Sequence, residues 1–458
     1  MIILHGGCLP KASHRKAGIG GSAIIRYFAP KSSLFLQLGA RRLKNAALLL
    51  AVFGLTTFAF VACSSNKTTR LTARILASQS VSSPTAAAGL VIINGEYDTR
   101  FSEIQAGTAP GLMAINPNRT TLLAFDTATN SVEVVNTKTQ ALTGTISLPG
   151  PTTSMVALAT GSGFAAVPSA PINAAPPGAV EILNLASGGI AATINVPNAQ
   201  TLVASPDGTK VLAFAGDSDA LTVVSPLLVN TSNPYVTTVS GFDRPAYAVF
   251  SADSSTAYVL NCGPECGGAK ASVQPLNLAT LALGTPIPVN AGTIGLINGS
   301  TLYVVGNSPT NESCAGQTTA ATTCGRLNIV DLTSMTVTAS AVITDGYHNR
   351  IDLSTNGQLF IGSHTCTNVG NVNNPTGEVR GCLTIFNTQT NAVVIPPVNG
   401  DVTGFQSLTT RDVEYVAEGG ILRVYDTTID SLLLNSYITT GIINITGQII
   451  DVKAIDFI

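Results

Sequence analysis

The polar residues best suited to chemistry gather in one short stretch of the chain. His348 and His364 are the two histidines that follow residue 63, and Asp345 and Arg350 lie close to His348 in the sequence. Two imidazoles beside a carboxylate could hold a metal ion or move a proton, and a guanidinium could bind an anionic group. The alternative is that both histidines are ordinary loop residues without a ligand.

The strands that carry these residues decide whether the two imidazoles can meet. The sequence STNG at 354–357 is typical of a turn between two antiparallel strands. If this turn sets the register, His348 faces Ser363 and His364 faces Tyr347, which places the two rings on opposite faces of the sheet. A metal site shared by both rings would then need a β-bulge. We therefore expect neither a metal nor another cofactor at these residues.

Arg244, in the segment FDRPAY, is a further candidate for binding an anionic ligand, although an ion pair at the protein surface is the simpler interpretation. The chain contains no GxSxG, HExxH, GxxxxGK[ST] or EF-hand motif, and nothing pairs a nucleophile with a base. The sequence therefore favours a binding protein over an enzyme. The candidate binding residues are Arg244, Asp345, His348, Arg350 and His364.

Six cysteines follow residue 63, and they form three pairs of close neighbours. The spacing of Cys262 and Cys266 would suit two zinc ligands, but no second short-spaced pair and no nearby histidine completes a tetrahedral site. Each pair encloses one loop between two strand-like runs, and an export signal precedes all of them. We therefore predict three local disulfides, although six cysteines allow fifteen pairings: Cys262 with Cys266, Cys314 with Cys324, and Cys366 with Cys382.

The N-terminal region reads as an export signal. Basic residues at 41–44 precede an uncharged apolar stretch at 46–62, and Cys63 follows it directly. The sequence VAC at 61–63 resembles the lipobox of bacterial lipoproteins, which implies that Cys63 is acylated and becomes the new N-terminus. Ser64 resembles the sorting residue of lipoproteins that are sent to the outer membrane. The alternative is an uncleaved membrane anchor, because 17 apolar residues are close to the minimum for crossing a bilayer.

Composition excludes some classes of protein. Only 10% of the residues are charged and 45% are hydrophobic, which excludes a mainly disordered chain. From Cys63 onward, 15 Lys and Arg residues and 25 Asp and Glu residues give 15 − 25 = −10. A negative body argues against a nucleic-acid partner.

One pattern returns every 41 to 55 residues after about residue 107. Each copy contains a turn with an apolar strand, such as ASPDGTKVLAFA from Ala204, and a later strand with a turn, such as LNIVDLTSM from Leu327. Seven complete copies are present. A period of this length with about four strands per copy indicates a β-propeller, in which each four-stranded blade buries its faces against its neighbours. We therefore divide the chain into a leader and signal peptide at 1–62, a flexible linker at 63–88 and an all-β propeller at 89–458.

Several segments together resemble the YVTN family of propeller repeats, also called YncE-like. They are the SPDG turn at 205–208, strands such as AYVLN, and strand-turn units such as IVDLTS. The segment at 90–98 and the tail at 447–458 resemble further strands. A closing blade made from both ends of the chain would give eight blades and hide the sheet edges, whereas a split copy would leave seven.

In this arrangement all three cysteine loops join second and third strands, so they share the top rim of the ring. We expect a membrane-anchored envelope protein that presents this rim to a protein or peptide. The alternatives are a lactonase-like enzyme, since some similar propellers are lactonases, and a structural surface-layer protein. An enzyme should show several charged side chains converging in the central channel, whereas a scaffold should show small or apolar residues there.

Overall fold

A computed structural model describes residues 71–80, 89–170, 173, 175–229, 231–367, 381–396 and 400–457. Cys63 and the expected signal peptide at 1–62 lie outside the described residues. No helix within the described ranges is long and apolar enough to span a membrane. The compact unit that contains the propeller spans Leu71–Ile458.

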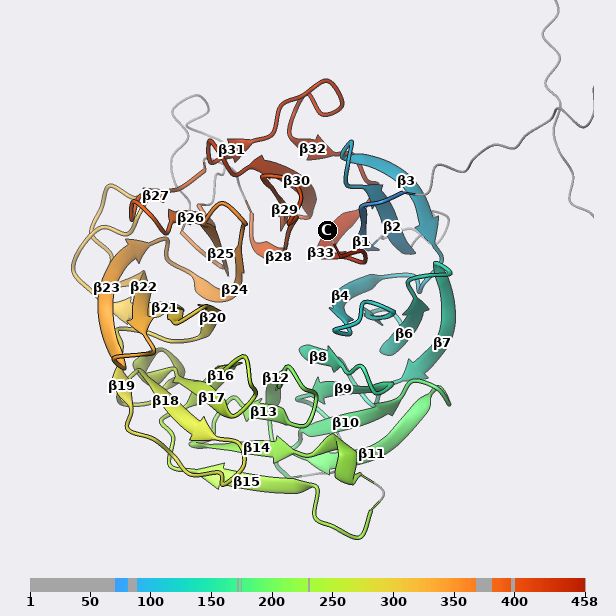
Figure 1. Cartoon of the computed structure of the whole chain (residues 1–458), viewed down its shortest axis with the longest axis vertical. Coiled ribbons are helices and arrows are strands. Elements are labelled where there is room, and N and C mark those ends of the chain that lie inside the picture. Colours follow the sequence, from blue (N-terminus) through green and yellow to red (C-terminus); the bar gives the residue numbers. More distant parts are fainter. Residues whose placement is uncertain are drawn as a thin grey trace, which may run out of the picture. The chain divides into compact units, whose positions relative to one another are not determined.

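The chain forms a β-propeller of eight antiparallel blades, which settles the choice between seven and eight (Figure 1). Blades 1 to 4 follow the chain from the inner strand to the outer strand. Their strands are β4 (Pro110–Ile115), β5 (Thr121–Asp126), β6 (Ser131–Asn136) and β7 (Ala141–Ser147); β8 (Ser154–Ala157), β9 (Ser162–Val167), β10 (Ala179–Asn184) and β11 (Gly189–Asn195); β12 (Ala199–Ala204), β13 (Val211–Ala215), β14 (Ala220–Val224) and β15 (Val236–Ser240); and β16 (Pro245–Phe250), β17 (Thr256–Asn261), β18 (Ser272–Asn277) and β19 (Ile287–Pro288).

Blades 5 to 7 continue in the same order, and blade 8 closes the ring with strands from both ends of the chain. The strands of blades 5 to 7 are β20 (Ile294–Asn298), β21 (Thr301–Pro309), β22 (Thr323–Asp331) and β23 (Thr336–Ile343); β24 (Tyr347–Leu353), β25 (Gln358–His364), β26 (Leu383–Asn387) and β27 (Val393–Val394); and β28 (Val402–Ser407), β29 (Val413–Glu418) and β30 (Ile421–Asp426), with the short β31 (Ser431–Leu432) and β32 (Ile442–Ile443) both paired to β30. Those of blade 8 are β33 (Gln448–Ala454), β1 (Arg74–Ser80), β2 (Gly89–Asn94) and β3 (Thr99–Ile104).

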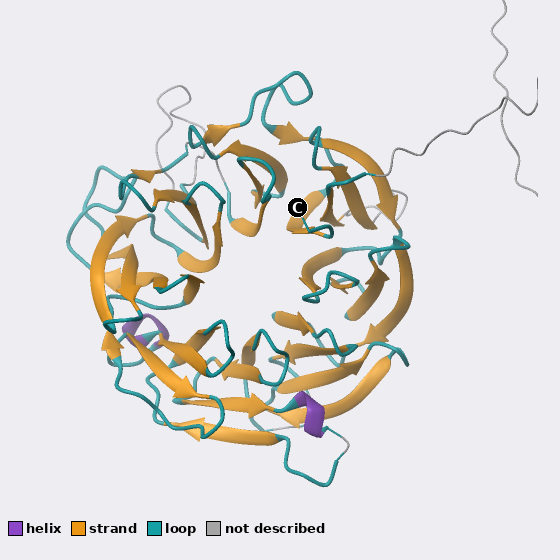
Figure 2. Cartoon of the chain, in the orientation of Figure 1, coloured by secondary structure: helices purple, strands orange, loops and turns teal. Residues whose placement is uncertain are grey.

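The burial of each strand follows from its place in the blade. Second strands such as β9 and third strands such as β10 are buried along almost their whole length, because neighbouring blades cover both of their faces. Outer strands such as β7 are mostly exposed. Figure 2 shows strands throughout the ring, and the two helices within the described residues are single 3-10 turns, η1 (Pro226–Leu228) and η2 (Gly263–Cys266).

Blade 8 confirms closure by both termini but contains a strand that the sequence did not predict. β1 lies within residues 63–88, which we expected to form a flexible linker. It pairs with the C-terminal β33, with Ile75 opposite Ala454 and Ala77 opposite Val452. Its sequence RILASQS contains buried Ser78 and Gln79 instead of a continuous apolar run, which explains why its composition resembled a linker.

A belt of buried polar residues runs through the third strands of seven blades. In blades 5 and 6, belt residues form hydrogen bonds with the loops that lead into the inner strands of the same blades. Asn328 accepts a hydrogen bond from the Asn290 N–H at 3.1 Å, and the hydroxyls of Thr384 and Thr344 lie 3.1 Å apart. The belt comprises Glu133, Glu181, Thr222, Gln274, Asn328, Thr384 and Arg423.

Candidate functional site at the channel mouth

The inner strands enclose a central cavity of about 1640 Å³. Most of its lining residues are small or apolar, such as Ala114, Val156 and Gly295. The charged residues in the lining are Arg119, Asp207, Arg244, Arg350, Asp451 and Lys453.

All three predicted disulfides are formed, and they lie in the consecutive blades 4, 5 and 6. Each bridges the loop between the second and third strands of its blade, at the end of the ring where the inner strands begin. We call this end the top face and these three blades the stapled sector. The disulfides indicate an oxidising location outside the cytoplasm. Within the described ranges, no cluster of three or more His, Cys, Asp and Glu residues could hold a metal ion.

The structure confirms the expected register of the two histidines. Tyr347 pairs with His364 and His348 pairs with Ser363, and a bulge separates His348 from Arg350. The rings of Tyr347 and His364 lie on the channel side, 5.1 Å apart at their centroids. Burial lowers the pKa of His364 below 6.5, and the charge of Arg350 contributes to this shift. His364 therefore presents a neutral imidazole to the mouth at pH 7.

His348 lies on the other face of the sheet and is completely buried. Its ring packs against Gly325, where an added Cβ would lie 2.6 Å from the imidazole Cε1. Neither ring nitrogen has a hydrogen-bond partner among the described residues, and burial lowers the pKa of His348 to about 4. The bulge therefore does not bring the two rings together, and His348 fills space between blades.

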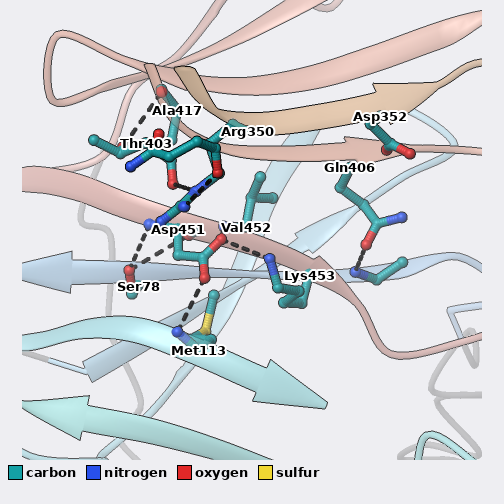
Figure 3. Close-up of polar contacts among 12 residues, drawn as sticks. Ser78, Met113, Arg350, Asp352, Thr403, Gln406, Ala417, Asp451, Val452 and Lys453 are labelled. Atoms are coloured by element: carbon teal, nitrogen blue, oxygen red, sulfur yellow. Dashed lines mark hydrogen bonds and ion pairs between the residues drawn. The ribbon is translucent and has the colours of Figure 1, made fainter. Parts of the chain in front are cut away.

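Arg350 is the predicted residue best placed to bind a ligand. Its Nε donates to the carbonyl oxygen of Thr403 at 2.6 Å (Figure 3). Its Nη1 donates to the carbonyl oxygen of the preceding residue, Asn349, at 2.8 Å. These contacts fix the guanidinium plane across the inner strands β24 and β28. Among the described residues, no carboxylate is hydrogen-bonded to it or forms an ion pair with it. A fixed guanidinium in a cavity wall is suited to bind a carboxylate or another planar anion.

Asp345 and Arg244 both have partners that explain their positions. The carboxylate of Asp345 accepts the Thr367 N–H at 2.9 Å and also its hydroxyl, so it supports the base of the third cysteine loop. The Nε of Arg244 lies 3.7 Å from the carboxylate of Asp219 at the rim. This contact agrees with the interpretation of Arg244 as part of a surface ion pair.

Glu265 is a residue of the stapled sector that the sequence analysis missed. It lies inside the Cys262–Cys266 ring, and its Oε2 accepts the Asn307 N–H from blade 5 at 2.7 Å. Asn307 in turn donates through Nδ2 to the Gly346 carbonyl of the following loop at 2.6 Å, so these contacts join all three stapled blades. Burial raises the pKa of Glu265 to about 7. An acid inside the short disulfide-closed segment CGPEC was the signal that could have revealed it.

Two blades from Arg350 along the channel wall, the carboxylate of Asp451 on β33 already has hydrogen-bond partners. Figure 3 shows its carboxylate between Met113 and Lys453, from which it accepts hydrogen bonds of 2.9 Å and 2.7 Å. It also accepts the N–H of Val452 at 2.8 Å. Asp451 therefore offers no free carboxylate to Arg350.

The ionisable groups of the mouth do not form a catalytic constellation. Within the described part of the chain, no hydrogen bond joins Arg350, His364 and Glu265 to one another. Each instead contacts the backbone or a polar neighbour. This arrangement can bind and orient a ligand, but it shows no nucleophile with its base.

Comparisons with known proteins support the fold without identifying a function. No family model and no curated protein matches the chain. Among solved structures, it is similar to the dihydro-heme d1 dehydrogenase NirN, with a TM-score of 0.56 and 12% identity over 84% of this chain and 75% of that one. It is also similar to a putative 6-phosphogluconolactonase from Bacteroides fragilis, with a TM-score of 0.50 and 12% identity over 85% and 99%. A computationally designed protein matches with a TM-score of 0.51 and 9% identity over 77% and 96%.

Proposed function

We propose that this chain is an exported, membrane-tethered propeller of the YVTN type that binds an acidic group of an envelope protein or peptide at its channel mouth. The observation that carries the proposal is the guanidinium of Arg350. It lines the cavity, two backbone carbonyls fix it, and no carboxylate among the described residues neutralises it. The Tyr347–His364 pair beside it supplies ring surface for the rest of the ligand.

The stapled sector explains how the mouth keeps its shape. Its three disulfides close loops on consecutive blades, and the contacts from Glu265 through Asn307 to Gly346 connect those blades. Ordered loops on a rigid scaffold are where binding usually occurs. Membrane tethering through Cys63 rests on its lipobox-like setting and on the oxidising location that the disulfides indicate.

A panel of short peptides tests this function. Each peptide is supplied as a free C-terminal acid and as the corresponding amide, and the unfolding temperature of the protein is measured with each. We expect free acids that fit the mouth to stabilise the wild type and their amides to have little effect. Arg350→Met should lose this stabilisation, whereas Arg100→Met, which removes an outer-strand guanidinium paired with Glu103, should keep it. Equal shifts for acids and amides, or an unchanged response of Arg350→Met, would contradict the proposal.

Glu265 supports an enzyme as the second candidate. A carboxyl group with a pKa of about 7 can accept or donate a proton at neutral pH, and its Oε1 has no hydrogen-bond partner in the described structure. A lactonase-like enzyme would use such a group to take the proton of the attacking water. Hydrolysis of a lactone panel that disappears in Glu265→Gln would favour this candidate. No hydrolysis by the wild type would leave the binding function.

A further inference from the structure

A cluster of exposed apolar residues covers the outer edge where blades 7 and 8 meet. In blade 8, Tyr97 lies in the β2–β3 turn and Phe101 lies in β3. The outer part of blade 7 contributes Ile429, Leu434 and Tyr437. These five residues, the apolar patch, are between 44 and 66% exposed. The rings of Tyr97 and Tyr437 lie 5.0 Å apart, which joins the two blades into one surface. Figure 1 shows the loop between β31 and β32 projecting from the ring near β3.

Among the described residues of blades 1, 2, 3 and 5, exposed large apolar side chains on the outer side of the ring occur singly. Leu142, Ile190, Leu227 and Val337 lie in blades 1, 2, 3 and 5, one in each. Scattered residues of this kind need no explanation, whereas five in two adjoining blades, joined by the contact of Tyr97 with Tyr437, mark an interaction surface. We therefore expect a partner to cover the apolar patch.

The start of the described chain lies against this patch. The Gly95 N–H donates to the Ala73 carbonyl at 2.7 Å, and the Thr72 hydroxyl donates to the carboxylate of Glu96. Both contacts are made to the turn that carries Tyr97. Leu71 follows Cys63 by eight residues, and eight extended residues span at most about 28 Å. An anchor at Cys63 would therefore hold this edge of the propeller close to the membrane.

We infer that the apolar patch rests on the surface of the lipid bilayer that holds the Cys63 anchor; this inference depends on the proposed tethering. Tyrosine suits this position, because its ring enters the apolar boundary while its hydroxyl stays in water. Tyr97 and Ile429 lie in turns between third and fourth strands, at the face opposite the cysteine loops. A bilayer on this edge leaves the channel mouth facing away from the membrane and open to a partner.

A single tryptophan tests the inference, because the chain contains none. Tyr437→Trp places the reporter in the patch, and Leu227→Trp places it on the opposite side of the ring at a residue of similar exposure, 63% against 59%. Both full-length proteins are produced with a radioactive fatty acid in a host that acylates lipoproteins. They are then reconstituted into vesicles in which the lipids carry bromine on their acyl chains.

We expect the emission of Tyr437→Trp to shift to the blue and to be quenched at least threefold more than that of Leu227→Trp. A protein that is acylated and vesicle-bound but shows equal quenching at both positions, or none at residue 437, overturns the inference and leaves the tethering intact. A protein without the fatty-acid label overturns the tethering and the inference with it. Loss of quenching together with dimers in sedimentation would assign the patch to a second copy of the chain.

Discussion

Blades 4 to 6 carry three disulfides on the top face, whereas blades 7 and 8 are joined at the opposite face by the ion pair of Arg411 with Asp98. Each disulfide closes a loop within one blade, over at most 16 residues. In contrast, Arg411 binds both carboxylate oxygens of Asp98, at 2.7 and 2.8 Å, across 313 residues of sequence. Covalent links therefore shape the mouth, while non-covalent contacts between distant segments close the ring. The comparison predicts that the contacts that close the ring contribute more to the free energy of unfolding than the disulfides do.

The largest expected effect comes from removing Asp98, whose side chain is fully buried between Arg411 and the hydroxyl of Tyr415. Asp98→Ala should lower the free energy of unfolding by about 3–5 kcal/mol, because it leaves a guanidinium and a hydroxyl without their partner. Asp219→Ala, which removes the exposed partner of Arg244, should change it by less than about 0.5 kcal/mol. Urea unfolding measures both, and equal effects would contradict the comparison.

Glu418 should make the closing region sensitive to rising pH. Burial raises the pKa of its carboxyl to about 7, despite the nearby Arg423 at 3.4 Å. The folded state therefore prefers the protonated acid. The contribution of Glu418 to the free energy of unfolding is complete below pH 4.5 and is lost as pH rises through 7. The loss should be roughly 3 kcal/mol, since one pKa unit corresponds to about 1.4 kcal/mol. Glu418→Gln should reduce this slope in unfolding measured from pH 4.5 to 8, whereas the exposed Glu312→Gln should not.

His348 should make the stapled sector sensitive to falling pH. Burial lowers its pKa from 6.5 to about 4, so the folded state prefers the neutral ring. The contribution of the neutral His348 ring to the free energy of unfolding is complete above pH 6.5 and is lost as pH falls through 4. Thermal unfolding of His348→Gln between pH 7 and 4 should show a weaker acid dependence than the wild type. If His348→Gln reduced the acid dependence of the unfolding temperature less than the half-buried His364→Gln did, burial of His348 would not be the cause of that dependence.

The smallest of these effects on stability should come from the third disulfide. Replacing Cys366 and Cys382 together with serine should lower the unfolding free energy by about 2–3 kcal/mol, because the closed loop is short. The same variant should weaken ligand binding at the mouth, because Asp345 supports this loop at its base. An effect on stability larger than that of Asp98→Ala would reverse the roles assigned to the two regions.

Local sequence patterns were sufficient to predict much of this fold. The repeated turn-plus-strand units gave seven blades, the STNG turn gave the register of His348 and His364, and close spacing gave the disulfide pairs. Each of these features depends on residues that are near neighbours in the chain. The closing blade was predicted in part, because its inner strand at the C-terminus is apolar.

Other features depend on contacts between distant residues, which a single sequence does not display. β1 contains Ser78 and Gln79, and only coverage by neighbouring blades makes it a buried strand. The pKa of Glu265 is raised by its burial between blades, and hydrogen bonding to Asn307 of the next blade offsets only part of that effect. The sequence selected Arg350 as a candidate, but only the structure shows its fixed guanidinium in the channel wall.

The central claim is that Arg350 receives the acidic group of a ligand at the channel mouth. A crystal structure of the propeller with a stabilising peptide acid tests it most directly. We predict a carboxylate within hydrogen-bonding distance of the Arg350 guanidinium, with the adjoining part of the peptide against Tyr347 and His364. A peptide bound elsewhere on the ring, with the Arg350 guanidinium free of it, would contradict the claim.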